Sequence, residues 1–273
     1  MIRRKTAMHE GDRSAPLLDV EGLNVHLGHG SQRTRILNDV SFSVAPGTTL
    51  GIVGESGSGK STLAKTIVGI HAPHSGAIRF RGEDIGHRSG RRRRGIMREV
   101  QMIPQDPYSS LDPRRTIAQT LAEAIDPARV RVGRHRERVD ELLALVQLDR
   151  DAAARYPREF SGGQRQRIAI ARALAVDPEL VIADEITSAL DLSTQAEVLK
   201  LFADLKKRLG ITVLFVSHNL AVVQEVSDSV LVLLHGETVE HRSAEEIFRD
   251  PRAPYTRLLL DSVPGGPGFS LDA

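Results

Sequence analysis

The sequence predicts an α/β fold, with a core of parallel strands, a flanking antiparallel sheet and an inserted helical segment. Four short apolar runs have the composition of buried parallel strands, and helix-like sequence follows each of the first three. That alternation is typical of an α/β core, whose ligands bind at the carboxyl ends of its strands. The runs are 49–53, 180–183, 212–216 and 230–234.

Two stretches of the chain do not follow this alternation. In residues 17–44 apolar and polar side chains alternate, which predicts an antiparallel sheet beside the core. Residues 106–160 contain no good strand, and four of their apolar residues have the spacing of an amphipathic helix: Val139, Leu142, Leu143 and Val146. The predicted parts are a core with its antiparallel subdomain over 1–105 and 165–248, a helical subdomain over 106–164 and a tail over 249–273.

The composition excludes several classes of protein. With 273 residues and 40% hydrophobic content, the chain can bury a full core. No stretch approaches the ~18 apolar residues of a membrane-spanning helix, so we expect the chain to stay on the side of the membrane where it is made. The absence of cysteine excludes disulfides and thiolate metal sites. A formal charge of +2 gives no indication of nucleic acid as a partner.

A glycine-rich loop follows the first of the four runs. Residues 54–61 match G-x-x-x-x-G-K-[ST] and lie between that strand and a helix opening at Lys60. Backbone N–H groups of such a loop wrap phosphates, Lys60 reaches the β and γ phosphates, and Ser61 can ligate Mg²⁺. The alternative is an ordinary glycine turn. The predicted nucleotide-binding residues are Gly54, Glu55, Ser56, Gly57, Ser58, Gly59, Lys60, Ser61 and Thr62.

Two acidic residues end the second run, and a second glycine motif precedes a helix. Asp184 is predicted to hold Mg²⁺, and Glu185 to orient and deprotonate an attacking water. Taken alone this pair is a weak signal, since many buried strands end in an acid. Ser161, Gly162, Gly163 and Gln164 open a helix, which predicts a second anion site; the alternative is a helix cap followed by a glycine turn.

In this order and at this spacing, the motifs resemble those of the ABC ATPase family over roughly the whole chain. The resemblance implies a P-loop NTPase core with a flanking antiparallel β-subdomain and an inserted α-helical subdomain. Walker A is then 54–61, Walker B is 180–184 and the signature is 160–164. The resemblance also implies that Gln105 senses Mg²⁺ and water, that His218 contacts the γ-phosphate, and that Asp191 of the D-loop helps to organise a subunit interface.

The family resemblance implies that ATP binds between two subunits. Two ATPase subunits meet head to tail, and the signature of one closes over the ATP held by the Walker motifs of the other. Ser161 and its helix N-terminus supply donors that the Walker motifs alone lack. ATP then favours the closed pair, and hydrolysis releases it. The implied cofactors are ATP and Mg²⁺.

Two further segments resemble the oligopeptide, dipeptide and nickel importer subgroup: residues 105–114 and the tail segment 253–259. The sequence Tyr108-Ser109-Ser110 is similar to the corresponding segment of the second of the subgroup's two paired ATPases. The subgroup implies two membrane-spanning permease subunits, a second ATPase subunit, homologous or identical, and an extracytoplasmic substrate-binding protein. It also implies a position at the cytoplasmic face of a bacterial or archaeal membrane and a cargo of peptides or nickel-type metal chelates.

Two other classes of function remain as alternatives. A soluble ABC ATPase acting on nucleic acid or ribosomes is disfavoured, because about 100 residues and no long coiled coil separate the motifs, which occur once. A binding module without catalysis would lack one of Lys60, Asp184, Glu185 or His218, and all are present. Four positions depart from the family pattern: Leu27 for an adenine-stacking aromatic, Pro104 for an aromatic, Ile186 for proline and Asn219 for aspartate.

Overall fold

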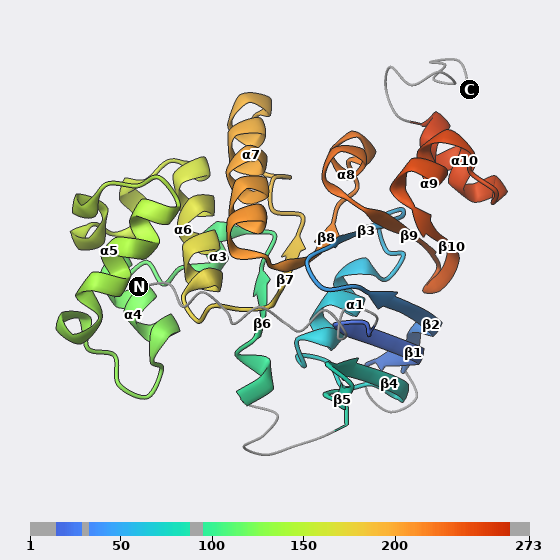
Figure 1. The fold of residues 1–273 in the computed structure, drawn as a ribbon, viewed down its shortest axis with the longest axis horizontal. Helices are drawn as coiled ribbons and strands as arrows, with labels where there is room; N and C mark the ends of the chain where they lie inside the picture. Colours follow the sequence, from blue (N-terminus) through green and yellow to red (C-terminus); the bar gives the residue numbers. More distant parts are fainter. Residues whose placement is uncertain (1–14, 29–32, 88–94, 263–273) are drawn as a thin grey trace. The chain divides into compact units, whose positions relative to one another are not determined.

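The computed structural model describes residues 15–28, 33–87 and 95–262, which divide into two compact units (Figure 1). The helix-rich unit comprises residues 98–211, and the sheet-rich unit comprises the described residues of 15–97 and 212–262. The sequence assigns residues 98–105 and 165–211 to the core, but in the structure they belong to the same unit as the helical segment. The predicted division into three parts stays a prediction. Within the described ranges, none of the helices combines the length and apolar character that crossing a bilayer requires.

An antiparallel sheet forms one layer of the sheet-rich unit, with the strand order β2-β1-β4-β5. Strand β1 pairs antiparallel with both β2 and β4, and buries Leu18, Val20, Leu23 and Val25 on one face. This pairing confirms the antiparallel sheet predicted from the alternation over 17–44. Its strands are β1 (Leu18–Leu27), β2 (Thr34–Val44), β4 (Ser75–Phe80) and β5 (Glu83–Asp84).

The remaining strands of the sheet-rich unit have the order β10-β9-β3-β8. Strand β3 runs parallel to β8 and β9, and all residues of β3 and β8 are buried, which explains their uninterrupted apolar sequence. The edge strand β10 pairs antiparallel with β9 and was not predicted, because its sequence is polar. These elements are β3 (Thr49–Val53), β8 (Thr212–Val216), β9 (Ser229–Leu234) and β10 (Glu237–Ser243), with helices α1 (Lys60–Ile67), α8 (Leu220–Val226), α9 (Ala244–Arg249) and α10 (Pro254–Asp261).

The helix-rich unit contains the predicted amphipathic helix and a pair of parallel strands. Figure 1 shows α4, α5 and α6 lying beside one another, and α5 buries Val139, Leu142 and Leu143 as its periodicity predicts. Strand β6, with four residues, was not predicted. The elements are β6 (Val100–Ile103), α3 (Pro107–Ser110), α4 (Ile117–Ile125), α5 (Arg136–Leu145), α6 (Gly162–Leu174), β7 (Leu180–Asp184) and α7 (Leu192–Leu209), with 3-10 turns at Val132–His135, Arg150–Ala154 and Pro157–Glu159.

Candidate functional site

The loop after β3 requires glycine at two of its positions. Gly54 has a φ of 148°, and a Cβ built there would lie 2.1 Å from the carbonyl oxygen of Leu233. Gly59 has a φ of 104°, and its Cβ would lie 2.6 Å from the Leu37 side chain. Both conformations are costly for any residue with a side chain. The sequence pattern is therefore explained by backbone geometry and close packing.

Lys60 is buried against the carbonyl groups of this loop. Its Nζ lies 2.7 Å from the oxygen of Gly54 and 2.7 Å from that of Glu55. The N-cap of α1 is Gly59, which has no side chain to cap the helix, and the first turn carries no acidic residue. A cation and a helix N-terminus without a side-chain cap make this loop suited to anionic phosphate groups. Ser61 and Thr62 follow in the first turn and are half-buried.

The other predicted site residue of the sheet-rich unit is His218, which is exposed in the turn between β8 and α8. Its neighbour Asn219 is the N-cap of α8, and its Oδ1 accepts hydrogen bonds from the N–H groups of Ala221 and Val222 at 3.1 and 3.3 Å. Asparagine and aspartate are equally good N-caps. The departure from the family pattern at Asn219 therefore leaves the start of α8 intact.

At the end of β1, Leu27 is half-buried and has no ring for an adenine base to stack on. The ring of the preceding His26 instead lies 4.1 Å from that of His74. Partial burial, followed by the nearby His74 and arginine charges, lowers the pKa of His26 and keeps this ring neutral near pH 7. The expectation that Leu27 gives no ring stacking stays a prediction.

In the helix-rich unit, parallel pairing brings Gln105 and Glu185 together. Strands β6 and β7 pair in parallel with Ile103 opposite Ala183, so the residues two positions further on emerge side by side. The Gln105 side chain donates a hydrogen bond of 2.8 Å to Oε2 of Glu185. Between Ala183 and Glu185, Asp184 ends β7 and is almost fully buried. The predicted base thus has a side-chain partner that the sequence order could not show.

The turn after Glu185 holds this residue in an unusual backbone conformation. Glu185 has a φ of 47°, in the left-handed region, and its carbonyl oxygen accepts hydrogen bonds from the backbone N–H and Oγ of Ser188 at 3.1 and 3.0 Å. Ile186, the residue that replaces the usual proline, is 1% exposed. Its burial anchors the turn, so this departure from the family pattern leaves the turn closed.

The second glycine motif forms a capped helix start. The Oγ of Ser161 accepts a hydrogen bond from the N–H of Gln164 at 3.3 Å, and Oε1 of Gln164 accepts one from the N–H of Ser161 at 3.0 Å. This reciprocal pair is a capping box. A hydroxyl that accepts one N–H still has a proton to donate. Ser161 can therefore cap α6 and also bind an anion.

Helix α6 approaches α7 closely at the signature glycines. A Cβ at Gly163 would lie 2.3 Å from Cγ2 of Thr194, and one at Gly162 would lie 3.3 Å from Leu190. Asp191 caps α7, because Oδ1 accepts hydrogen bonds from Ser193 Oγ and Thr194 N and Oδ2 accepts one from Thr194 Oγ1. These bonds, that from Ser193 first, hold the pKa of Asp191 far below its usual value. This packing of Gly163 against Thr194 could not be predicted, because the two residues lie on different helices.

Comparison with known proteins places this geometry in a family. The model of the family described as "ABC transporter" matches residues 37–188. The oligopeptide transport ATP-binding protein OppF of Bacillus subtilis is 45% identical over 251 residues, which cover 91% of this chain and 82% of OppF.

Solved structures agree with the sequence comparison. CbiO1 of Clostridium perfringens, part of the ABC transporter complex cbiONQ, has a TM-score of 0.75 at 28% identity, covering 86% of this chain and 91% of CbiO1. A dimeric ATP-binding cassette in a post-hydrolysis state with ADP and Pi has a TM-score of 0.73 at 27% identity, covering 83% of this chain and 98% of that one. The chain therefore belongs to the ABC transporter family, as one of its ATPases with the α/β fold of that family.

Proposed function

We propose that this chain hydrolyses ATP to power the import of short peptides through a pair of membrane-spanning permease subunits. The hydrogen bond between Gln105 and Glu185 is the observation that carries the catalytic part, because it joins the predicted base to the predicted sensor of Mg²⁺ and water. The peptide cargo is supported by the similarity to OppF, an oligopeptide transport protein. The relatives described above are transport proteins, so nothing in them favours a soluble ATPase acting on nucleic acid or ribosomes.

In this proposal the phosphate loop of residues 54–61 binds the phosphates of ATP. Lys60, buried beside the loop carbonyls, binds the β and γ phosphates, and the N–H groups at the start of α1 bind phosphate oxygens. Ser61, Asp184 and Gln105 would hold Mg²⁺, which would neutralise charge on the phosphates. His218 contacts the γ-phosphate from its exposed turn.

Glu185 is the proposed general base. Its left-handed backbone turns it away from the line of β7, and Gln105 holds one of its carboxylate oxygens. The carboxylate can accept a proton from the attacking water, while the Gln105 amide keeps it in one orientation. Asp184, buried at the strand end, serves Mg²⁺ and has no part in this proton transfer.

The signature acts on the ATP of a second ATPase subunit, homologous or identical. Ser161 has a hydroxyl proton left after capping α6, and the helix N-terminus adds positive potential. Asp191 keeps the D-loop in place beside it by capping α7. The dimeric structure with ADP and Pi supports a paired arrangement. The pair would sit at the cytoplasmic face of a bacterial or archaeal membrane and receive peptides indirectly from an extracytoplasmic binding protein.

Peptide uptake in a deletion strain tests the proposal. Loss of the gene is expected to abolish uptake of labelled di- to tetrapeptides and to leave sugar uptake unchanged. The wild-type gene should restore uptake, whereas a Lys60→Ala gene should not. A defect confined to the uptake of nickel chelates would mean that the cargo is a metal chelate and not a peptide. A defect confined to sugar uptake would show that both cargo classes are wrong.

Replacing Glu185, the proposed base, tests the proposed mechanism of ATP hydrolysis. Glu185→Gln keeps the shape and the partner of the side chain but removes the base, which costs ~10²- to 10⁴-fold in rate. We expect turnover to fall by that factor while ATP still binds, so that light scattering detects an ATP-dependent pair. The control is Glu179→Gln, which makes the same chemical change just before the first residue of β7 and should leave turnover unchanged. Near-normal turnover of Glu185→Gln would mean that another group activates the water.

A further inference from the structure

One peptide group of the phosphate loop is held at both ends. The carbonyl oxygen of Gly54 accepts a hydrogen bond from Lys60 Nζ at 2.7 Å, and the adjoining N–H of Glu55 donates one to the Tyr255 hydroxyl at 3.1 Å. A peptide group is planar, so its C=O and N–H rotate together. The bond to Tyr255 therefore also fixes the oxygen that receives the ammonium group of Lys60.

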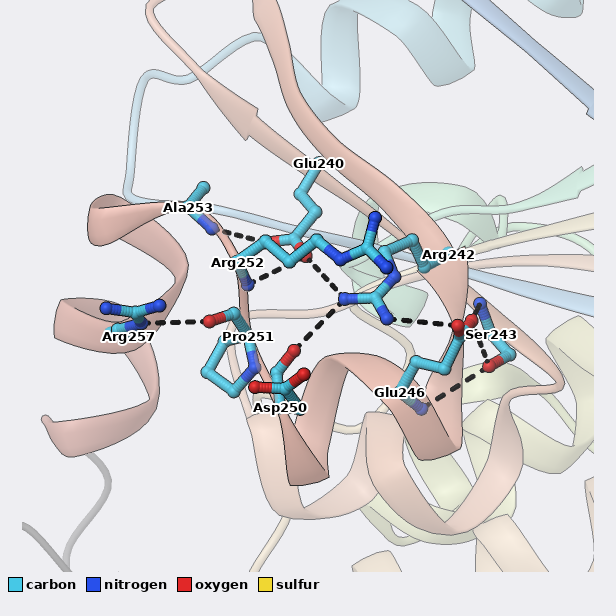
Figure 2. Close-up of polar contacts among 9 residues, drawn as sticks. All are labelled: Glu240, Arg242, Ser243, Glu246, Asp250, Pro251, Arg252, Ala253 and Arg257. Atoms are coloured by element: carbon cyan, nitrogen blue, oxygen red, sulfur yellow. Dashed lines mark hydrogen bonds and ion pairs between the residues drawn. The ribbon is translucent and has the colours of Figure 1, made fainter.

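Tyr255 lies in α10, which is fastened to β10 by a buried carboxylate. Glu240 of β10 is 7% exposed and accepts the backbone N–H groups of Arg252 and Ala253, both at 3.1 Å (Figure 2). Burial by itself raises the pKa of Glu240, but these N–H groups and Arg242 outweigh it and lower the pKa overall. The carboxylate therefore remains charged at neutral pH and holds the start of α10.

A second set of contacts fixes the segment between α9 and α10. As Figure 2 shows, Arg242 reaches Glu240 at 3.3 Å, the carbonyl of Asp250 at 3.0 Å and Glu246 at 3.0 Å. Arg257 donates to the carbonyl of Pro251 at 2.8 Å. These contacts span both sides of the bend that leads into α10. The position of the tyrosine is thus set by the tail's own attachments to β10 and α9.

The state of the Tyr255 hydroxyl suits a hydrogen-bond acceptor in this place. The side chain is half-buried, and this burial raises its pKa further above neutrality, so the phenol stays protonated. A neutral phenol can accept the N–H of Glu55 and still donate its own proton elsewhere. Its next neighbour Thr256 is buried, which prevents the helix from turning the ring away from the loop.

We propose that Tyr255 is a positioning residue of the nucleotide site. It acts through the peptide group between Gly54 and Glu55, whose carbonyl oxygen holds the Lys60 ammonium by a hydrogen bond. The C-terminal segment 249–262 is then part of the ATP-binding machinery, although its sequence lies about 200 residues from the loop. This inference rests on the proposed binding of ATP by that loop.

Equilibrium binding of labelled ATP to the full chain tests the inference. Tyr255→Phe removes only the hydroxyl, and losing one neutral hydrogen bond is expected to weaken ATP binding by about 2- to 10-fold. In the assembled transporter, KM for ATP should rise by a similar factor while kcat stays unchanged. A role in stability alone would not separate the two constants in this way.

Matched variants keep the outcome unambiguous. Tyr156→Phe makes the same chemical change in the helix-rich unit and should leave ATP affinity unchanged, and Lys60→Ala should weaken binding far more than Tyr255→Phe does. Wild-type affinity in Tyr255→Phe, a fall in kcat alone, or an equal loss in Tyr156→Phe would overturn the inference. Failure of the wild-type chain to bind ATP at all would instead refute the proposed function.

Discussion

The two glycine-rich helix starts differ in how their backbone donors are used. At α1 the N-cap is Gly59, which has no side chain, and the buried cation of Lys60 lies beside it. At α6 the N-cap is Ser161, whose hydroxyl and the amide of Gln164 satisfy each other's backbone N–H groups. The first helix start has no side-chain cap, whereas the second uses a capping box to stabilise its own helix.

Two similar glycine motifs can therefore serve different ends, the one mainly ligand binding and the other mainly helix stability. At the α1 start, Gly54 and Gly59 are required by positive φ angles and by contact with backbone and side-chain atoms. At the α6 start, Gly163 is required by the close approach of Thr194. We therefore expect substitutions at α1 to affect mainly nucleotide affinity, and substitutions at α6 to affect mainly stability or a partner subunit.

The largest effect is expected from Lys60→Ala. It removes the only side-chain cation that the loop motif contributes, and charge-assisted hydrogen bonds are worth about 1.5–3 kcal/mol each. Losing one such bond to the β phosphate and one to the γ phosphate predicts roughly 10²- to 10⁴-fold weaker ATP binding. Calorimetric titration of the isolated chain would measure this, with the melting temperature as a control for folding. Unchanged affinity would refute the assignment of this loop.

A smaller and different effect is expected from changes at Ser161. Ser161→Arg should leave ATP binding by the isolated chain intact and reduce hydrolysis by the assembled transporter on the order of 100-fold, as when a transition-state donor is lost. Both Ser161→Arg and Ser161→Ala should lower stability by about 1 kcal/mol, the usual cost of losing an N-cap. If Ser161→Arg abolished binding by the single chain, the two helix starts would serve the same ATP and the comparison would fail.

The smallest effects are expected at the signature glycines, and they concern stability. Gly163→Ala should cost about 1–3 kcal/mol through overpacking, because Thr194 is held by Asp191 and cannot rotate away. Gly162→Ala meets its nearest neighbour only at 3.3 Å and should be milder. Adding Thr194→Ser removes Cγ2, keeps the hydroxyl and should restore most of the loss. Urea unfolding of the wild type and these three variants tests this, and no recovery of stability in the double variant would mean that the clash is not the cause.

Much of the fold could be predicted because several elements carry a local signal. The runs 49–53 and 212–216 form strands with the predicted bounds, and those at 180–183 and 230–234 lie within β7 and β9. Strands β6, β4 and β10 could not be predicted, because they are short or partly polar and are stabilised by their neighbours. The residue roles assigned by family resemblance stay predictions.

Local sequence was enough to identify the functional motifs at the two helix starts and at the end of β7. It could do so because glycine, lysine and carboxylate motifs are contiguous and need no partner to be recognised. Tertiary contacts determine which distant residues meet: Gln105 with Glu185 through the register of β6 and β7, and Tyr255 with Glu55 through the attachment of α10. Such contacts depend on strand pairing and helix packing between distant segments, which local sequence does not specify.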